Sequence, residues 1–289
     1  GFCNMIFRMI EANQGQDAAT HFGVIFDHKA KTFRSEIFPA YKANRPPPPD
    51  DLIPQFDLIK SATRAFNIPC IEVPGYEADD IIASYANQAY SSGGSVVIVS
   101  SDKDLMQLVS DGITMLDAMK NTMINREKVF EKFGVYPEKV IEVQALAGDS
   151  VDNIPGAPGI GIKTAAQLVA EFGNVENLLN NLERITQPKR RQTLNDNIEK
   201  IRISKQLVTL NRSAPLPTSL DDLAIREIQP QILLDFLAEM EFNPSRKHHT
   251  ILRNPPARLL EKSRFEDFGF SRFWIDLGKC LEAILKDLG

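Results

Sequence analysis

The chain has 289 residues and a mass of 32.3 kDa, which allows one large domain or a domain with a smaller partner and excludes a large multidomain assembly. Hydrophobic residues make up 43% of the chain and charged residues 25%, a composition typical of globular proteins and of neither disordered nor fibrous ones. The 33 lysine and arginine residues against 38 aspartate and glutamate residues give a net charge of −5, which by itself argues weakly against a polyanionic partner.

The cysteines and the apolar stretches restrict the compartment. Cys3, Cys70 and Cys280 are odd in number and far apart, so they indicate neither a disulfide framework nor a zinc ribbon. The longest uninterrupted apolar stretch, residues 96–99, is far shorter than a membrane-spanning helix, and no signal-peptide pattern opens the chain. We therefore expect a cytoplasmic protein without a membrane partner.

Strands and helices alternate over the first half of the chain. Apolar residues at helical spacing follow Gly1 directly, with no capping residue before them, which indicates a chain cut from a longer one. The four prolines of residues 46–49 exclude regular structure around them. The expected strands are 22–26, 70–73, 95–100 and 113–116, and the expected helices after the first are 51–66, 77–90 and 105–109.

This alternation predicts an α/β fold with a mostly parallel central sheet and helices on both faces. From about Asn125 the strand signals stop, and helical patterns separated by glycine and proline continue to about Phe242. We therefore expect an α/β region over residues 1–130 and an all-helical region over residues 131–245. Residues 246–289 form an unassigned tail, with helical spacing only near its end, from Leu277 on.

Acidic residues gather where the expected strands end. They are Asp27 after the first strand, Glu77, Asp79 and Asp80 after the second, Asp102 and Asp104 after the third, and Asp149 and Asp152 in a G-D-S-V-D-N motif of the helical region. Because the carboxyl ends of parallel strands meet at one edge, these eight carboxylates should face one cleft. Crowded carboxylates are stabilised by hard divalent cations, and two such ions suit the attack of water on a phosphodiester. The pattern predicts two Mg²⁺ ions, with Mn²⁺ as the alternative.

A structural alternative exists for each acidic residue taken singly, because aspartate and glutamate are common helix caps. The three motifs together favour a metal site. One geometric difficulty remains: in a helix that includes Glu77, Asp80 shares its face and Asp79 does not. Either the helix begins after Glu77 or Asp79 has a different role.

A glycine-rich loop precedes the expected helix 165–172. Its glycines allow close approach of a phosphate, and the helix N-terminus adds partial positive charge. Eight basic residues against two acidic ones between Arg184 and Arg212 reinforce this, although such a run can also be a solvated helix face. The loop predicts sequence-independent binding of a nucleic-acid backbone through Gly159, Gly161, Lys163 and Thr164.

A basic segment leads into the proline run. Tyr41 could stack on a base, and Lys42 and Arg45 could contact phosphates, with Arg34 just upstream, so the segment is a candidate gate over a single strand; an exposed linker is the alternative. Lys103 lies between Asp102 and Asp104 and could steady a scissile phosphate, or it could be an exposed lysine at a helix start.

These motifs together resemble the 5′-nuclease domain of bacterial DNA polymerase I, a branch of the flap endonuclease superfamily. The resemblance covers about residues 1–245 and rests on VIFDHK, SEIFPAYKANRPPPPDDL, VPGYEADDIIAS, SSDKDLMQLVS, ALAGDSVDNIPGAPGIGIKTA and EMEF, in that order. It implies a helical arch over the active site and a helix-three-turn-helix subdomain. It also implies a monomer that removes RNA primers and 5′ flaps from duplex DNA with two magnesium ions.

The resemblance also implies the roles of individual residues. The eight acidic residues match metal ligands, and Arg34, Lys42 and Arg45 fall in the arch. In the glycine-rich loop, relatives often bind a potassium ion through backbone carbonyls.

Two departures from the family pattern stand out. Relatives begin with a further strand that lies inside the sheet and carries an aspartate ligand, so its absence here predicts a lost ligand and an exposed sheet edge. No polymerase residues follow. We interpret the chain as an N-terminally truncated 5′ nuclease, with a DNA-binding remnant without catalysis as the alternative. A phosphatase with an aspartyl nucleophile would need D-x-D after the first strand, and Asp27-His28-Lys29 does not provide it.

Overall fold

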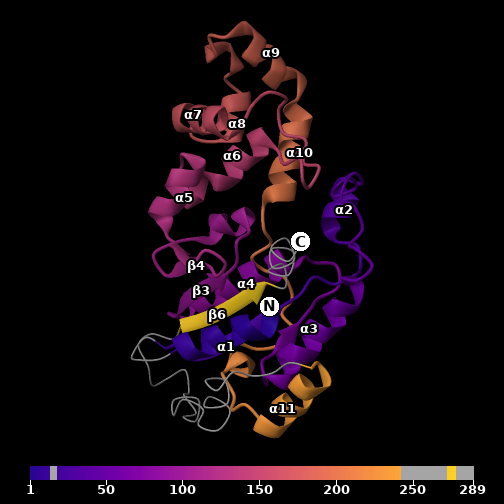
Figure 1. Ribbon diagram of the computed structural model, residues 1–289. Helices are drawn as coiled ribbons and strands as arrows, with labels where there is room; N and C mark the ends of the chain where they lie inside the picture. Colours follow the sequence, from indigo (N-terminus) through magenta and orange to yellow (C-terminus); the bar gives the residue numbers. More distant parts are fainter. Residues whose placement is uncertain (14–17, 242–271, 278–289) are drawn as a thin grey trace.

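The computed structural model of the chain describes residues 1–13, 18–241 and 272–277 (Figure 1). In the view of Figure 1, the lower part is a sheet covered by helices and the upper part consists of helices. The chain passes from the lower part to the upper part near residue 125 and returns near residue 210. The predicted fold class, an α/β region followed by a helical subdomain, is confirmed.

The sheet has the strand order β2-β1-β6-β3-β4-β5. All neighbouring strands are parallel except β4 and β5, which are antiparallel. Every residue of β1 is buried, as expected for a parallel strand covered on both faces. The strands are β1 (His21–Ile25), β2 (Cys70–Ile71), β3 (Ser95–Val99), β4 (Ile113–Asp117), β5 (Thr122–Ile124) and β6 (Arg272–Leu277).

Strand β6 comes from the far end of the sequence and lies between β1 and β3. Asp276 is in register with Val24 of β1 and with Val99 of β3. The predicted exposed edge is therefore wrong for this structure, because β6 pairs with both neighbouring strands. The predicted helical spacing begins at Leu277, but Leu277 is the last residue of strand β6. The edges of β1 and β3 leave room for one strand between them, which favours extended backbone over a helix. Residues 278–289 lie outside the described residues.

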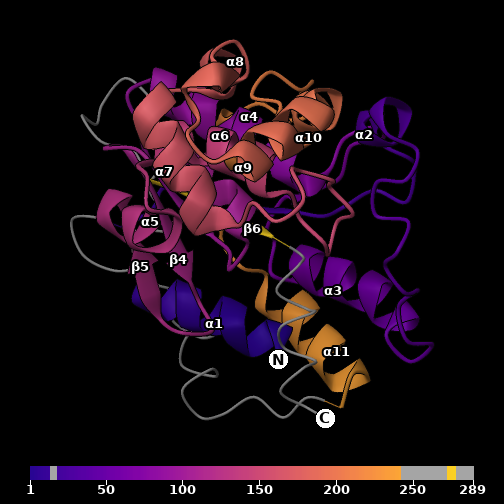
Figure 2. The same cartoon turned by 90° about the horizontal axis from the view of Figure 1, so that it is seen from above.

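Helices cover both faces of the sheet. Figure 2 shows α1, α3 and α11 on one side of β6 and α4 on the other. Val24 packs in the core with α1, α3 and α11, whereas Ile25 packs in the core with α4. Their bounds are α1 (Phe2–Ala12), α3 (Ile53–Ala65), α4 (Ala78–Ser91) and α11 (Pro230–Glu239), and the short helix η1 (Lys103–Leu108) follows β3.

The helical subdomain continues the core of α4. Residues of α6, α7 and α8 belong to the same buried cluster as those of α4 and β3, so the two parts share one core. The short helix α2 (Phe33–Ile37) lies beside α10 (Figures 1 and 2). The helices of the subdomain are α5 (Arg126–Phe133), η2 (Pro137–Lys139), α6 (Val140–Ala147), α7 (Ile162–Phe172), α8 (Val175–Leu179), η3 (Leu182–Arg184), α9 (Pro188–Asp196) and α10 (Ile198–Val208). The short helix η4 (Asp221–Leu223) follows the return of the chain to the sheet and lies against β1.

The predicted elements of the α/β region agree with the structure to within a few residues, but the short helix α2 and the strands β5 and β6 were not predicted. Strand β5 has three residues, two of them exposed, and pairs with one neighbour only, so its sequence carries little of the alternation that identifies strands. Among the described residues, we find no helix both long and apolar enough to cross a membrane.

The central place of β6 leads to a test. Proline at position 275 removes a backbone donor from a strand whose neighbours lie on both sides, so we expect Ile275→Pro to lower the free energy of unfolding by about 2–4 kcal/mol. Urea unfolding followed by circular dichroism measures this. The control Ile275→Val keeps the backbone donor, and equal stability of the two variants would contradict the placement of β6.

Candidate active site

The predicted acidic residues lie at the carboxyl edge of the sheet and in the loop after α6. Asp27 follows β1, and its Oδ1 accepts a hydrogen bond from the backbone N–H of Ala78 in the first turn of α4 (2.7 Å). Asp102 follows β3 and caps η1 by accepting from the N–H of Asp104 (2.9 Å). The sheet edge thus brings the residues after β1 and β3 towards the start of α4, as the sequence predicted.

Helix α4 begins at Ala78, so Glu77 is its N-cap. A capping box joins Glu77 and Asp80: each side chain accepts from a backbone N–H of the other residue. The Glu77 carboxylate also accepts from the Tyr41 hydroxyl (3.1 Å) and the Lys42 ammonium (2.5 Å). The geometric difficulty with Asp79 is resolved by the later helix start, and Asp79 is buried in the first turn.

Asp80 forms a buried ion pair with Arg34. The guanidinium binds both carboxylate oxygens, at 2.6 and 2.8 Å, and the two side chains are 0% and 1% exposed. Arg34 also donates to the carbonyls of Leu207 (2.8 Å) and Thr209 (3.2 Å). Burial alone would lower the pKa of Arg34, but its hydrogen bonds and charge interaction with Asp80 raise it above the ordinary value.

This pair changes the roles that we assign to both residues. Each Asp80 oxygen is bound to the guanidinium, and Oδ1 also accepts from the Asn211 N–H (2.9 Å). Because Arg34 is buried, it does not present its charge to a strand at the surface. We therefore favour a positioning role for Asp80 and Arg34 over the predicted roles of metal ligand and DNA contact. Tyr41 is likewise buried, beside Ile154, so its ring is not exposed for stacking.

Lys42 and Arg45 hold the segment before the proline run against the loop after α6. The Lys42 ammonium contacts Glu77 (2.5 Å) and reaches Asp152 (3.9 Å), so one cation bridges carboxylates of two elements. Arg45 Nε donates to Asp152 Oδ1 (3.0 Å), and the backbone N–H of Lys42 donates to the Asp152 carbonyl (2.9 Å). Residues 41–45 therefore lie directly over the acidic site.

Lys103 is the third cation of the site. Its ammonium lies 2.5 Å from Asp149 Oδ2. Burial would raise the pKa of Asp149, but the hydrogen bond and charge of Lys103 lower it below the ordinary value. Conversely, Asp149 raises the pKa of Lys103 against the effect of burial. Asp149 is thus held ionised, and Lys103 is held protonated.

Two glycines shape the loop that carries Asp149 and Asp152. Gly148 and Gly156 both have positive φ, and their backbones touch: a methyl group on Gly156 would lie 2.4 Å from the nitrogen of Gly148. Two backbone hydrogen bonds between Asp149 and Ile154 close the loop above them. Only glycine fits at this contact, which explains the spacing of the G-D-S-V-D-N-I-P-G motif.

Gln144 is a site residue that the sequence analysis missed. Its Nε2 donates to Asp104 Oδ1 (2.5 Å), and the residue is 5% exposed on α6. The available signal was a polar side chain on the buried face of an otherwise apolar helix. Gln144 thus holds the Asp104 carboxylate against α6.

The donor set fits a hard divalent cation. In the described parts of the chain, no three His, Cys, Asp or Glu side chains already converge on a point. Instead, the ammonium groups of Lys42 and Lys103 and the guanidinium of Arg45 lie against the carboxylates and supply the positive charge. Carboxylate oxygens from several segments are the ligands that Mg²⁺ and Mn²⁺ prefer, and the sites of these side-chain cations mark where positive charge is stabilised.

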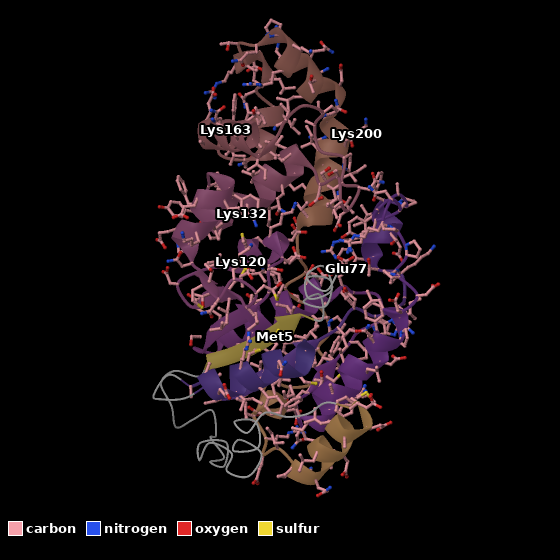
Figure 3. All side chains as sticks on the ribbon, in the orientation of Figure 1. Met5, Glu77, Lys120, Lys132, Lys163 and Lys200 are labelled. Atoms are coloured by element: carbon pink, nitrogen blue, oxygen red, sulfur yellow. The ribbon has the colours of Figure 1, made fainter. Side chains whose placement is uncertain are left out.

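The glycine-rich loop before α7 is open on its outer side. Gly159 has a φ of +77°, and neither Gly159 nor Gly161 has a neighbouring atom within 4 Å of an added Cβ. Lys163 is exposed in the first turn of α7, with Thr164 beside it (Figure 3). A phosphate can therefore approach this backbone closely.

The basic run of the helical subdomain is divided between two roles. Arg202 pairs with Glu176 (3.0 Å) and Lys205 with Glu142 (2.7 Å), so these two stabilise packing between helices. The exposed members on α9 and at the start of α10 are Lys189, Arg191 and Lys200, the last labelled in Figure 3.

Comparisons with known proteins identify the family. Residues 1–134 match the 5′-3′ exonuclease, N-terminal resolvase-like domain, and residues 135–231 match the 5′-3′ exonuclease, C-terminal SAM fold. The chain belongs to the 5′-3′ exonuclease family of enzymes. Within it, the chain is a 5′-3′ exonuclease domain of the DNA polymerase I type, as the resemblance implied.

Individual relatives agree with this assignment. The chain is 54% identical over 245 residues to DNA polymerase I of Rhizobium leguminosarum, matching 84% of this chain and 24% of the relative. It is 39% identical to a 5′-3′ exonuclease of Aquifex aeolicus, and the match covers 83% of this chain and 81% of the relative. Among solved structures, the bacteriophage T5 D15 flap endonuclease in complex with DNA and metal ions matches this chain with a TM-score of 0.61 and 22% sequence identity. The match covers 87% of this chain and 90% of the T5 protein, so the two share a fold. The chain thus spans about a quarter to a third of the length of the DNA polymerases I that it matches.

The Arg34–Asp80 pair provides a test of the site's scaffold. Arg34→Met leaves the buried Asp80 without its counter-charge, so we expect a loss of about 3–5 kcal/mol in the free energy of unfolding. The control Arg64→Met removes an exposed arginine of α3 and should have little effect. Urea denaturation of both variants decides: similar midpoints would contradict a structural role for the pair.

Proposed function

We propose that this chain catalyses metal-dependent hydrolysis of phosphodiesters at the 5′ ends and flaps of duplex DNA, the chemistry of primer removal in replication and repair. The observation that carries the proposal is the set of carboxylates at one edge of the sheet, held in place by three basic side chains. Membership of the 5′-3′ exonuclease family supports the reaction class. DNA and metal ions in the T5 flap endonuclease complex support the substrate and cofactor.

Six carboxylates are the proposed metal ligands. When bound, two Mg²⁺ ions, or Mn²⁺ ions, lower the pKa of water and stabilise negative charge on the phosphate. Asp80 is left out of this set because its oxygens are bound to Arg34, and the buried Asp79 is assigned to the helix N-terminus. The proposed ligands are Asp27, Glu77, Asp102, Asp104, Asp149 and Asp152.

The basic side chains of the site have two partners in turn. Lys42, Arg45 and Lys103 neutralise carboxylates in the structure. We propose that they contact the scissile phosphate and its neighbour once the carboxylates bind metal, because their charge is then better matched by phosphate oxygens. In this proposal, Lys42, Arg45 and Lys103 pair with carboxylates before metal binds and with phosphate oxygens afterwards.

The glycine-rich loop and α7 are the proposed anchor for the duplex. The open backbone at Gly159 and Gly161 and the exposed Lys163 suit a phosphate, with Thr164 as an additional donor. Backbone carbonyls of the same loop are the proposed ligands of a K⁺ ion. A monomer with cytoplasmic location remains our prediction for the chain.

A second candidate function is DNA binding without hydrolysis. Glu77, Asp152 and Asp149 are already paired with cationic side chains of the same protein, and no three carboxylates converge in the described residues. If metal does not displace these cations, the loop before α7 would still bind a duplex. Incubation with a labelled 5′-flap duplex separates the two functions. Cleavage in Mg²⁺ supports the nuclease, whereas binding in Ca²⁺ without cleavage in Mg²⁺ supports DNA binding without hydrolysis.

Substitution of a proposed ligand tests the metal assignment. Asp102→Asn removes a charged ligand, so we expect cleavage of the flap duplex to fall by at least about 100-fold while binding in Ca²⁺ changes little. The matched control Asp57→Asn alters an exposed residue of α3 and should cleave normally. A near-normal rate for Asp102→Asn would overturn the assignment.

Loss of charge at the proposed anchor tests the duplex-binding loop. Lys163→Ala should weaken flap-duplex binding equally for unrelated sequences and reduce the slope of log K against log salt by about 0.9, the value for one phosphate contact. Lys60→Ala serves as control, since Lys60 pairs with Glu72 (2.5 Å). Fluorescence anisotropy at several salt concentrations gives both quantities, and a loss that depends on base sequence would contradict the backbone role.

A further inference from the structure

Three lysines from separate elements lie together beside the acidic site. Lys103 belongs to η1, Lys120 to the turn between β4 and β5, and Lys132 to the last turn of α5. Desolvation by the surrounding protein, followed by the charges of Lys103 and Lys120, lowers the pKa of Lys132. Lys132 is exposed, and the repulsion that it feels from Lys103 and Lys120 is a cost that an anionic ligand would reduce.

The three lysines differ in their own counter-charges. Lys103 is paired with Asp149 at 2.5 Å, and Lys120 with Asp117 at 3.3 Å on an exposed side chain. For Lys132, the ion pairs found in the described residues include no carboxylate within 4.0 Å; Asp102 and Asp104 act on it from farther away. Lys132 is thus a cation next to the proposed metal ligands whose charge is not matched by a contact.

The position of these lysines suits the backbone of a duplex. Figure 3 shows Lys163, Lys132 and Lys120 in succession along one side of the molecule, from the start of α7 down to the turn after β4. Figures 1 and 2 both place α7, α5 and β4 on that side. A strand anchored at Lys163 can therefore continue past Lys132 on α5 towards Lys120 in the turn after β4.

We propose that Lys132 and Lys120 form a second phosphate-binding site for the duplex part of the substrate, between the anchor at α7 and the acidic site. The proposal rests on the proposed nuclease function and adds to it a fixed path for the duplex. Two contacts along one backbone would set how far the duplex end reaches into the carboxylates, because phosphate contacts fix register without reading bases.

Binding measurements on charge-neutralised variants test this site. We expect Lys132→Gln to reduce the slope of log K against log salt by about 0.9 for a flap duplex in Ca²⁺, and the double variant with Lys120→Gln to reduce it by about 1.8. The control Lys128→Gln changes the same charge on the same helix, but Lys128 pairs with Glu131 (2.7 Å), so its slope should equal that of the wild type. Slopes equal to the wild type in Lys132→Gln would overturn the site.

Two further readouts distinguish a duplex phosphate site from a structural lysine and from a contact to the single-stranded flap. Thermal unfolding of Lys132→Gln should occur at or above the wild-type temperature, because removal of an unmatched cation does not weaken the fold; a lower temperature would indicate a structural lysine instead. Binding of the flap strand alone as a single-stranded oligonucleotide should be unchanged, and an equal loss there would contradict a duplex site. A wild-type protein that neither binds nor cleaves the flap duplex would contradict the proposed nuclease function. If the wild type does both, the Lys132→Gln measurements test the phosphate site alone.

Discussion

The buried ion pair between Arg34 and Asp80 connects the parts of the molecule on which the site depends. Through Arg34 it joins α2 to the carbonyls of Leu207 and Thr209 at the end of α10, and through Asp80 it joins both to the first turn of α4. A buried pair of this kind tolerates little displacement, because either charge left alone costs several kcal/mol. The helix α2, the helical subdomain and the acidic start of α4 are thus fixed relative to one another by one guanidinium.

Around this pair, cations from elsewhere in the fold offset part of the negative charge of the acidic edge. The net charge of −5 suggested repulsion from a polyanion, but charge is unevenly distributed. Lys42, Arg45 and Lys103 pair with Glu77, Asp152 and Asp149, while exposed lysines remain along the side of α7 and α5. The local arrangement, and not the total, determines which surface can meet a phosphate backbone.

The gathering of the acidic residues at one edge of the sheet could be predicted from the sequence, because parallel strands present their carboxyl ends at one edge. The motif around Asp149 was also recognisable, since only glycine permits the contact between Gly148 and Gly156. The partners of Asp80 and Asp104 could not be predicted: Arg34 lies 46 residues from Asp80, and Gln144 lies 40 residues from Asp104. The position of β6 was unpredictable for the same reason, since a short apolar run does not specify which distant edge it will join.

The central claim is that the carboxylates of this edge form one site for divalent cations, in which side-chain ammonium groups hold the place of the ions. Anomalous diffraction from crystals of the protein soaked in Mn²⁺ tests this directly. The account predicts Mn²⁺ peaks among Glu77, Asp102, Asp149 and their neighbours, with the Lys42 ammonium displaced from Glu77. Mn²⁺ bound only elsewhere, with Lys42 still on Glu77, would contradict it.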